Sequence, residues 1–266
     1  MTGWLINEDT EIPVPEGNRY RPFFIEETDE GFRNRLAANP KAGADFVRAE
    51  AVKGSVEAQV GWGHMLLDGY GVERDAEAAL RWFKIAARSG SADAFNMVGR
   101  CHERGWGVAM DPEEAVRWFR PAAEKGHAWA RYNLGKLLAR GHAGNTDPHA
   151  ALTLLVSAAR SGVPKAMNML GRVRDEGVVG PPRKKSAALW YRWAAERGCF
   201  RGQFHHGRFL VAEGRTSDGI RWVRTSLAHA PQDFRRDALA ILKTHPSPEL
   251  RALATEYDTG EQGAVT

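Results

Sequence analysis

The stretch DPEEAVRWFRPAAEKG, residues 111–126, holds the pattern that decides the fold. It places a Trp-Phe pair four residues ahead of an Ala-Ala pair, and residues four apart share one face of an α-helix. Asp111 can cap the N–H groups at the start of such a helix. Pro112 suits the first helical position, where its missing N–H leaves no donor unpaired. These residues therefore predict a helix that starts after Asp111 and carries a bulky side chain one turn before each small one.

The same pattern recurs along the chain every 36 residues. The pair of large side chains recurs as Trp82-Phe83, Trp118-Phe119, Leu154-Leu155 and Trp190-Tyr191. The small pair recurs at 86–87, 122–123, 158–159 and 194–195. The closing glycine recurs as Gly54, Gly90, Gly126, Gly162 and Gly198. Four full units in register without a gap indicate a repeat protein.

Each unit is predicted to form two helices. In the second unit, Ala94, Val98 and Cys101 have the spacing of one face of a helix over residues 91–104. Gly105 follows, and the glycines of GWGV suit a left-handed helix cap and a tight turn. Burial of each aromatic side chain contributes about 2–3 kcal/mol, while the small residues let a neighbouring helix come close. A unit this small cannot bury its own apolar face, so the units must stack.

The order Ala-x-x-x-x-Gly, Gly-x-Gly-Val, Asp, Ala, Trp-Phe, Ala-Ala and Gly resembles the Sel-one-like repeat family, which is related to the tetratricopeptide repeats. The resemblance covers about residues 54–230. It implies an all-α fold, a right-handed superhelical solenoid of antiparallel helix pairs. It also implies a role as an interaction scaffold and no catalytic residues.

The register divides the chain into repeats and flanking segments. Residues 1–53 are predicted to be an N-terminal extension, with 1–21 as an extended segment on the first helices, followed by a degenerate leading unit. Ser247 and Pro248 are predicted to start the second of two C-terminal capping helices, within 231–258. A frayed tail is expected at 259–266. The repeats between these segments are predicted at 54–90, 91–126, 127–162, 163–198 and 199–230.

Composition and motif content exclude several classes of protein. The net charge of +4 slightly favours an acidic partner and does not demand nucleic acid. No apolar run is long enough to cross a membrane, and residues 1–17 lack the features of a secretory signal, so we expect a cytoplasmic protein. Cys101 and Cys199 form no spaced set, and no zinc-ligand pattern or nucleophile motif is present. We therefore expect no enzyme activity, no cofactor and no metal.

One polar position of the repeat stands out, because in every unit the residue after the glycine of the first helix is basic or a histidine. In a tetratricopeptide-like superhelix this position faces the concave groove, an orientation that comes from the resemblance. Asp68 and Glu176 interrupt the ends of the stripe. The predicted partner-binding residues are His64, Arg100, Lys136, Arg172 and Arg208, widened one turn further by Arg104 and Arg140.

These residues support three functional hypotheses and one alternative in which the stripe has no binding role. The leading hypothesis is an adaptor whose basic groove binds an acidic protein segment. The alternatives are a solenoid that contacts nucleic acid and a regulatory subunit of an enzyme complex. The stripe can also be a merely solvated face. Since exposed charges add little to stability, reversal of Arg100, Lys136 and Arg172 is expected to leave the fold nearly intact.

Overall fold

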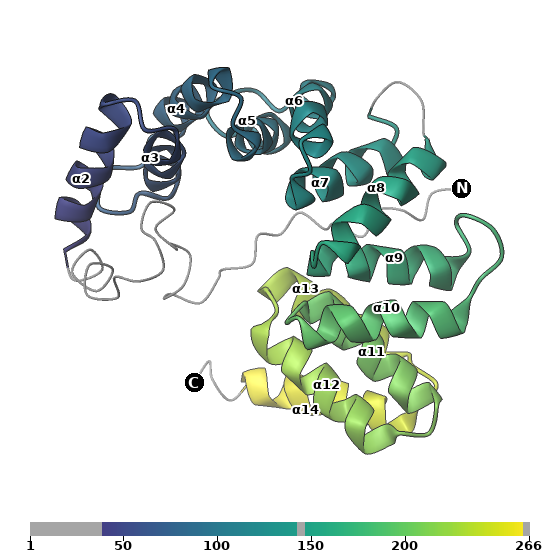
Figure 1. Ribbon diagram of the computed structural model, residues 1–266. Coiled ribbons are helices and arrows are strands. Elements are labelled where there is room, and N and C mark those ends of the chain that lie inside the picture. The colour runs from purple at the N-terminus through teal and green to yellow at the C-terminus, as the bar shows by residue number, and fades with distance from the viewer. Residues whose placement is uncertain (1–38, 143–146, 263–266) are drawn as a thin grey trace. The chain divides into compact units, whose positions relative to one another are not determined.

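The computed structural model describes residues 39–142 and 147–262, and within them every regular element is an α-helix (Figure 1). This confirms the all-α prediction for the described residues. The helices are α2 (Pro40–Val52), α3 (Val56–Asp68), α4 (Ala76–Arg88), α5 (Ala92–Arg104), α6 (Pro112–Glu124), α7 (Ala128–Ala139), α8 (Pro148–Arg160), α9 (Pro164–Glu176), α10 (Lys184–Glu196), α11 (Phe200–Ala212), α12 (Thr216–His229), α13 (Gln232–Lys243) and α14 (Pro248–Gln262).

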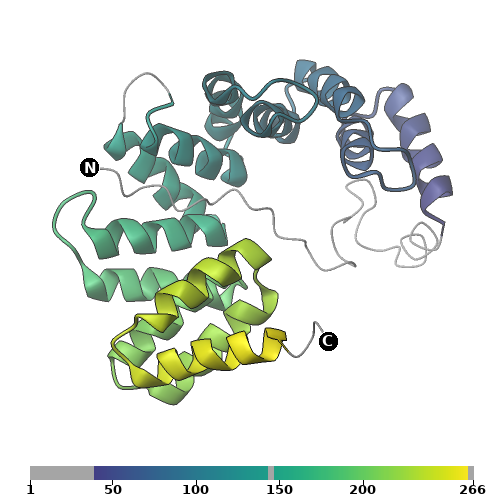
Figure 2. The same ribbon diagram turned by 180° about the vertical axis from the view of Figure 1, so that it is seen from behind.

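Each predicted repeat contains one pair of packed helices. The odd-numbered helices α3 to α11 are the first helices of their repeats, and the even-numbered helices α4 to α12 are the second helices. Second helices α4, α6, α10 and α12 pack on the first helices of their own repeats, and α4, α6 and α10 also pack on the first helix of the next repeat. Both views show α9 and α10 side by side, and α11 packs on α10 (Figures 1 and 2). The chain therefore has the helix pairs that the 36-residue period predicts.

The predicted helix starts are present in the structure. The carboxylate of Asp111 accepts a hydrogen bond of 2.9 Å from the N–H of Glu114, and Pro112 occupies the first turn of α6. Asp75 and Asp147 cap α4 and α8 in the same way, three residues before the N–H groups that they bind. At α10 the cap position holds Arg183, whose side chain makes no capping hydrogen bond. This helix therefore lacks a stabilising contact that its counterparts have.

The two aromatic side chains of the opening stretch, Trp118 and Phe119, lie in different environments. Phe119 is fully buried against Gly99 of α5, where an added Cβ would lie 2.6 Å from the ring. Glycine is therefore required at this position, because any side chain would overlap the ring. Trp118 is only partly buried, and its indole N–H donates to Glu114 over 3.0 Å. The expectation that both aromatics fill the interior is thus met by the second member of the pair alone.

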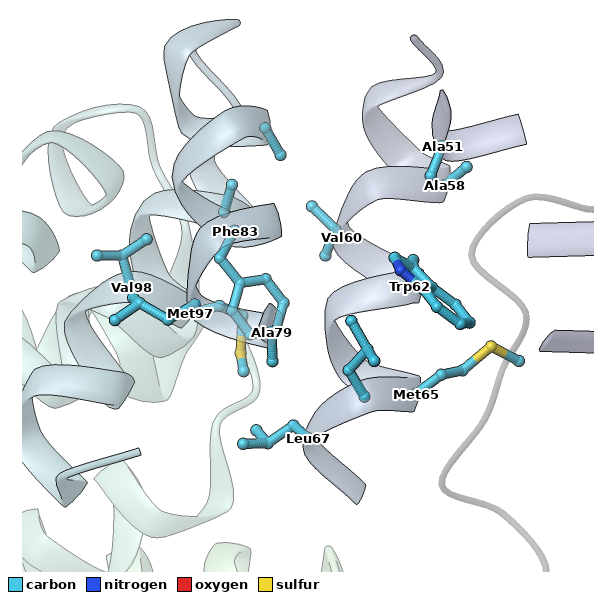
Figure 3. Close-up of a cluster of buried hydrophobic side chains, with 14 of the residues drawn as sticks. Ala51, Ala58, Val60, Trp62, Met65, Leu67, Ala79, Phe83, Met97 and Val98 are labelled. Carbon is cyan, nitrogen blue, oxygen red and sulfur yellow. The ribbon is translucent and has the colours of Figure 1, made fainter. Parts of the chain in front are cut away.

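The same glycine contact recurs in other repeats. Phe83 of α4 meets Gly63 of α3, and Tyr191 of α10 meets Gly171 of α9. Figure 3 shows the Phe83 ring among the buried side chains contributed by α3, α4 and α5, which include Val60 and Met97. The small residues of one helix and the large residue of the next are therefore complementary halves of one packing contact.

The described residues form two compact units, which divide between Ala158 and Ala159 within α8. We refer to them as the N-terminal unit, with α2 to α7 and most of α8, and the C-terminal unit, with α9 to α14. The core of the C-terminal unit includes Phe204, Leu227 and Leu242, from α11, α12 and α13. The candidate functional residues must therefore be described unit by unit.

The flanking predictions have different outcomes. Helix α2 occupies the place predicted for the second helix of the leading unit, and Ser247 precedes α14 as predicted. Helix α14 continues to Gln262, so it extends into the predicted tail. The predicted extended segment at 1–21 lies outside the described residues. The repeat boundaries themselves stay predictions.

Candidate functional site

The seven predicted binding residues lie on or directly after the first helices of their repeats, which places them on what we call the first-helix faces. The N-terminal unit contributes one such face from α3, α5 and α7, and the C-terminal unit contributes another from α9 and α11. Arg172 and Arg208 belong to the C-terminal face. The N-terminal face carries His64, Arg100, Arg104, Lys136 and Arg140.

Three polar contacts join α5 directly to α7 across the N-terminal first-helix face. One is an ion pair, one is a hydrogen bond from a histidine ring to a carboxylate, and one is a hydrogen bond between side-chain amides. The contacts are Glu103 Oε1 to Lys136 Nζ at 2.6 Å, Asp93 Oδ1 to His127 Nε2 at 2.9 Å, and the amide of Asn133 donating to Asn96 Oδ1 at 3.0 Å. Together they fix the register of one repeat against the next.

The expectation of an exposed charge is wrong for Lys136. Its side chain is 4% exposed and that of Glu103 is 8% exposed, so the pair is desolvated. The Lys136 side chain reaches Glu103 of α5, and both charged groups are shielded from solvent there. A buried charge is tolerable only when paired, and the Glu103 carboxylate neutralises the ammonium group. Lys136 therefore supports the junction between repeats, and its reversal to Glu would bring two buried carboxylates together.

His64 and Arg100 both contact aromatic rings, and neither is a fully solvated cation. Burial, with the nearby Arg100 charge, lowers the pKa of His64 to about 4, so His64 is neutral at pH 7. Its ring packs edge-on against Phe83, with 5.4 Å between the centroids. The Arg100 guanidinium lies over Trp106 at 4.8 Å from the ring centroid, a cation–π contact. Of these two residues, only Arg100 contributes positive charge to the N-terminal face.

Trp129 is an exposed residue on this face that the sequence analysis did not single out. Its side chain is 43% exposed, and its ring meets Tyr132 edge-on at 6.1 Å between centroids. Trp129 precedes Lys136 by two helical turns on α7, so both lie on the same side of the helix. The repeat register could have shown that Trp129 is exposed, because the equivalent positions of the other repeats hold charged residues: Glu57, Asp93, Lys165 and Arg201. A tryptophan at an otherwise charged position indicates an exposed aromatic.

The C-terminal first-helix face gathers several arginines around one neutral histidine. His205 stacks on Tyr191 at 4.6 Å between ring centroids. Burial, together with the positive charge of Arg208 and Arg172, lowers the pKa of His205 to about 3. Arg208 lies over Phe204 at 5.6 Å, and Arg172 pairs with an acidic residue one turn later on its own helix. This face therefore keeps positive charge that is not cancelled by a buried carboxylate.

Within the described residues, no group of three or more His, Cys, Asp or Glu side chains could hold a metal ion. Burial raises the pKa of the Cys101 thiol to about 12, so this cysteine is a poor nucleophile at neutral pH. His205 and the adjacent His206 contact different rings, those of Tyr191 and Trp222. In the part of the chain that the structure describes, no helix is both long and apolar enough to cross a membrane.

A family model described as Sel1 repeat matches residues 56–91, 92–127, 130–163 and 164–199, which is more than half of the chain. The protein belongs to the Sel1 repeat family, as the sequence pattern predicted. Repeats of this family generally mediate protein–protein interaction. None of the curated proteins matches this chain.

Two solved structures illustrate the fold. A Sel1 repeat protein from Oxalobacter formigenes matches 88% of this chain and 99% of its own, with a TM-score of 0.71 at 24% identity. The second is c5321, a protective antigen present in uropathogenic Escherichia coli strains and displaying an SLR fold. It matches 82% of this chain with a TM-score of 0.63 at 26% identity. The match covers 48% of c5321, so this chain spans about half its length. These likenesses show the solenoid fold.

Proposed function

We propose that the protein is a non-enzymatic scaffold that binds an acidic segment of a partner protein through its first-helix faces. The observation that carries the proposal is the exposed Trp129 side chain on a face where three polar contacts link α5 to α7. Exposed aromatics on a preorganised surface are typical anchors of protein interfaces. Each unit carries positive charge for an acidic segment on its own face: Arg100 in the N-terminal unit, and Arg172 and Arg208 in the C-terminal unit.

Nucleic acid fits the structure less well than a protein partner. Two residues of the predicted stripe offer no positive charge to a phosphate, because His64 is neutral at pH 7 and Lys136 is paired with Glu103. The salt dependence of nucleic-acid affinity follows the number of cations that meet phosphates, so a stripe this short predicts weak binding. Regulation of an enzyme complex is one form of the proposed scaffold. The cytoplasmic location stays a prediction, which fractionation of the source cells tests.

Photo-crosslinking from two matched positions tests the proposed function. A photoreactive phenylalanine analogue replaces either Trp129 on first helix α7 or Ile85 on second helix α4, whose side chain is 38% exposed. In source cells, the Trp129 position is expected to give a discrete covalent adduct with one partner protein, and the Ile85 position is not. Adducts from Ile85 alone would move the binding surface to the second helices. An adduct with nucleic acid at Trp129 would replace the protein partner.

A further inference from the structure

The contact between α9 and α11, which we call the α9–α11 junction, lies two repeats after the equivalent contact between α5 and α7, the α5–α7 junction. Addition of 72 to each residue number converts one junction into the other, because two repeats of 36 residues separate them. Equivalent positions therefore have the same place relative to their helices. The residues Asn96, Glu103, Asn133 and Lys136 of the first junction correspond to Asn168, Asp175, His205 and Arg208 of the second.

The amide contact is not repeated at the α9–α11 junction. His205 takes the place of Asn133, and its ring stacks on Tyr191. Asn168 is 2% exposed, and among the described residues its Oδ1 atom has no hydrogen-bond partner. In the first junction, by contrast, Asn96 Oδ1 accepts the Asn133 amide. A buried acceptor without a donor is costly, and a ligand that brings an N–H group would remove this cost.

The ion pair is not repeated either. Asp175 is one methylene group shorter than Glu103, and its carboxylate pairs with Lys184 of α10. In the part of the chain that the structure describes, Arg208 Nε is buried and has no hydrogen-bond partner. The guanidinium lies over the Phe204 ring, and a guanidinium group can bind a carboxylate through two parallel N–H groups. Arg208 and His205 are partly exposed residues, so solvent reaches this junction.

We propose that the α9–α11 junction is a carboxylate-binding subsite for an acidic residue of the partner segment. The partner's carboxylate takes the role at Arg208 that Glu103 takes at Lys136. A backbone N–H of the same segment donates to Asn168 Oδ1, so the subsite recognises a peptide rather than a bare anion. Arg172 follows Asn168 by one turn on α9 and adds positive charge beside it. This subsite rests on the proposed scaffold function and assigns its acid-recognising part to the C-terminal unit.

Binding of a labelled hexaglutamate peptide to the full chain, measured by fluorescence anisotropy, tests the subsite. Wild type is expected to bind hexaglutamate at least tenfold more tightly than hexaglutamine. Arg208→Met, which keeps the apolar stem over Phe204, is expected to lose this preference. The matched control is Arg192→Met on second helix α10, whose side chain is half exposed, and it should bind as wild type does. Equal affinities of the two Met variants would overturn the proposal.

Asp175→Glu provides a second measurement that does not require removal of the arginine. The longer side chain can reach Arg208 from within, as Glu103 reaches Lys136, and so should weaken hexaglutamate binding at least threefold while it raises the Tm. Unchanged affinity for hexaglutamate in Asp175→Glu would also overturn the subsite. Inorganic phosphate, which brings no N–H donor for Asn168, should compete poorly, and full competition would show a bare anion site. Loss of the subsite leaves the Trp129 adduct intact, whereas failure of the scaffold function removes that adduct.

Discussion

The buried ion pair between Lys136 and Glu103 makes a sharp prediction about stability. Lys136→Met keeps most of the apolar stem and removes the charge, which leaves the Glu103 carboxylate only 8% exposed and without its ammonium partner at 2.6 Å. Removal of one partner from a buried pair costs about 3–5 kcal/mol. The free energy of unfolding, from urea titrations followed by circular dichroism, is therefore expected to fall by about that amount. Hydrogen exchange should show faster opening of α5 and α7.

Two further variants separate the charge effect from general damage. The double variant Glu103→Leu with Lys136→Met replaces the pair by apolar side chains of similar size, and its stability should lie within about 1 kcal/mol of wild type or exceed it. Arg117→Met removes a cation that is 77% exposed and pairs with Glu114 on the surface of α6, so it should cost at most about 1 kcal/mol. A loss below 1 kcal/mol for Lys136→Met, or a double variant as unstable as both singles summed, would refute the desolvated-pair argument.

Three other changes test separate parts of the structure. Gly99→Ala places a Cβ 2.6 Å from the Phe119 ring and should cost about 1–3 kcal/mol in urea unfolding, with partial recovery when Phe119→Leu is added; no loss would contradict the packing argument. Because the pKa of His64 is lowered from 6.5 to about 4, its unfolded state gains a proton first, and stability present above pH 6.5 is lost toward pH 4 at about 1.4 kcal/mol per pH unit. His64→Asn should make that decline shallower, and an unchanged slope would reject a buried neutral imidazole. Arg183→Asp supplies the missing cap of α10 and should stabilise by about 0.5–2 kcal/mol in thermal melts, whereas Arg183→Ala should not match it.

The helices and their pairing could be predicted from the sequence because repetition made the pattern unambiguous. Asp111 and Pro112 mark a helix start by local chemistry alone, and the structure places α6 after Asp111. Gly99 could be recognised as a position of close packing because it recurs in register, although its contact with Phe119 needed coordinates. Local signals and period thus suffice for the fold.

The chemistry of the first-helix faces could be predicted only in part. A repeat register assigns each residue a place on its helix, but it does not say which residue of the next helix meets it. Lys136 is paired because Glu103 happens to occupy a position that holds Leu67 and Ala139 in the neighbouring repeats. His64 is neutral because of its burial, which no spacing reveals. The structure therefore buries Lys136 in an ion pair and leaves His64 neutral, whereas the binding role of the stripe stays a prediction.

The central claim is that the partner binds the first-helix faces, and its most direct measurement is the affinity of the partner captured at Trp129. Two charge-matched double variants are compared by calorimetry: Arg172→Met with Arg208→Met on first helices, and Arg192→Met with Arg221→Met on second helices, where both side chains are at least half exposed. We expect at least a tenfold loss of affinity for the first pair and less than a twofold loss for the second. A larger loss from the second-helix pair would contradict it.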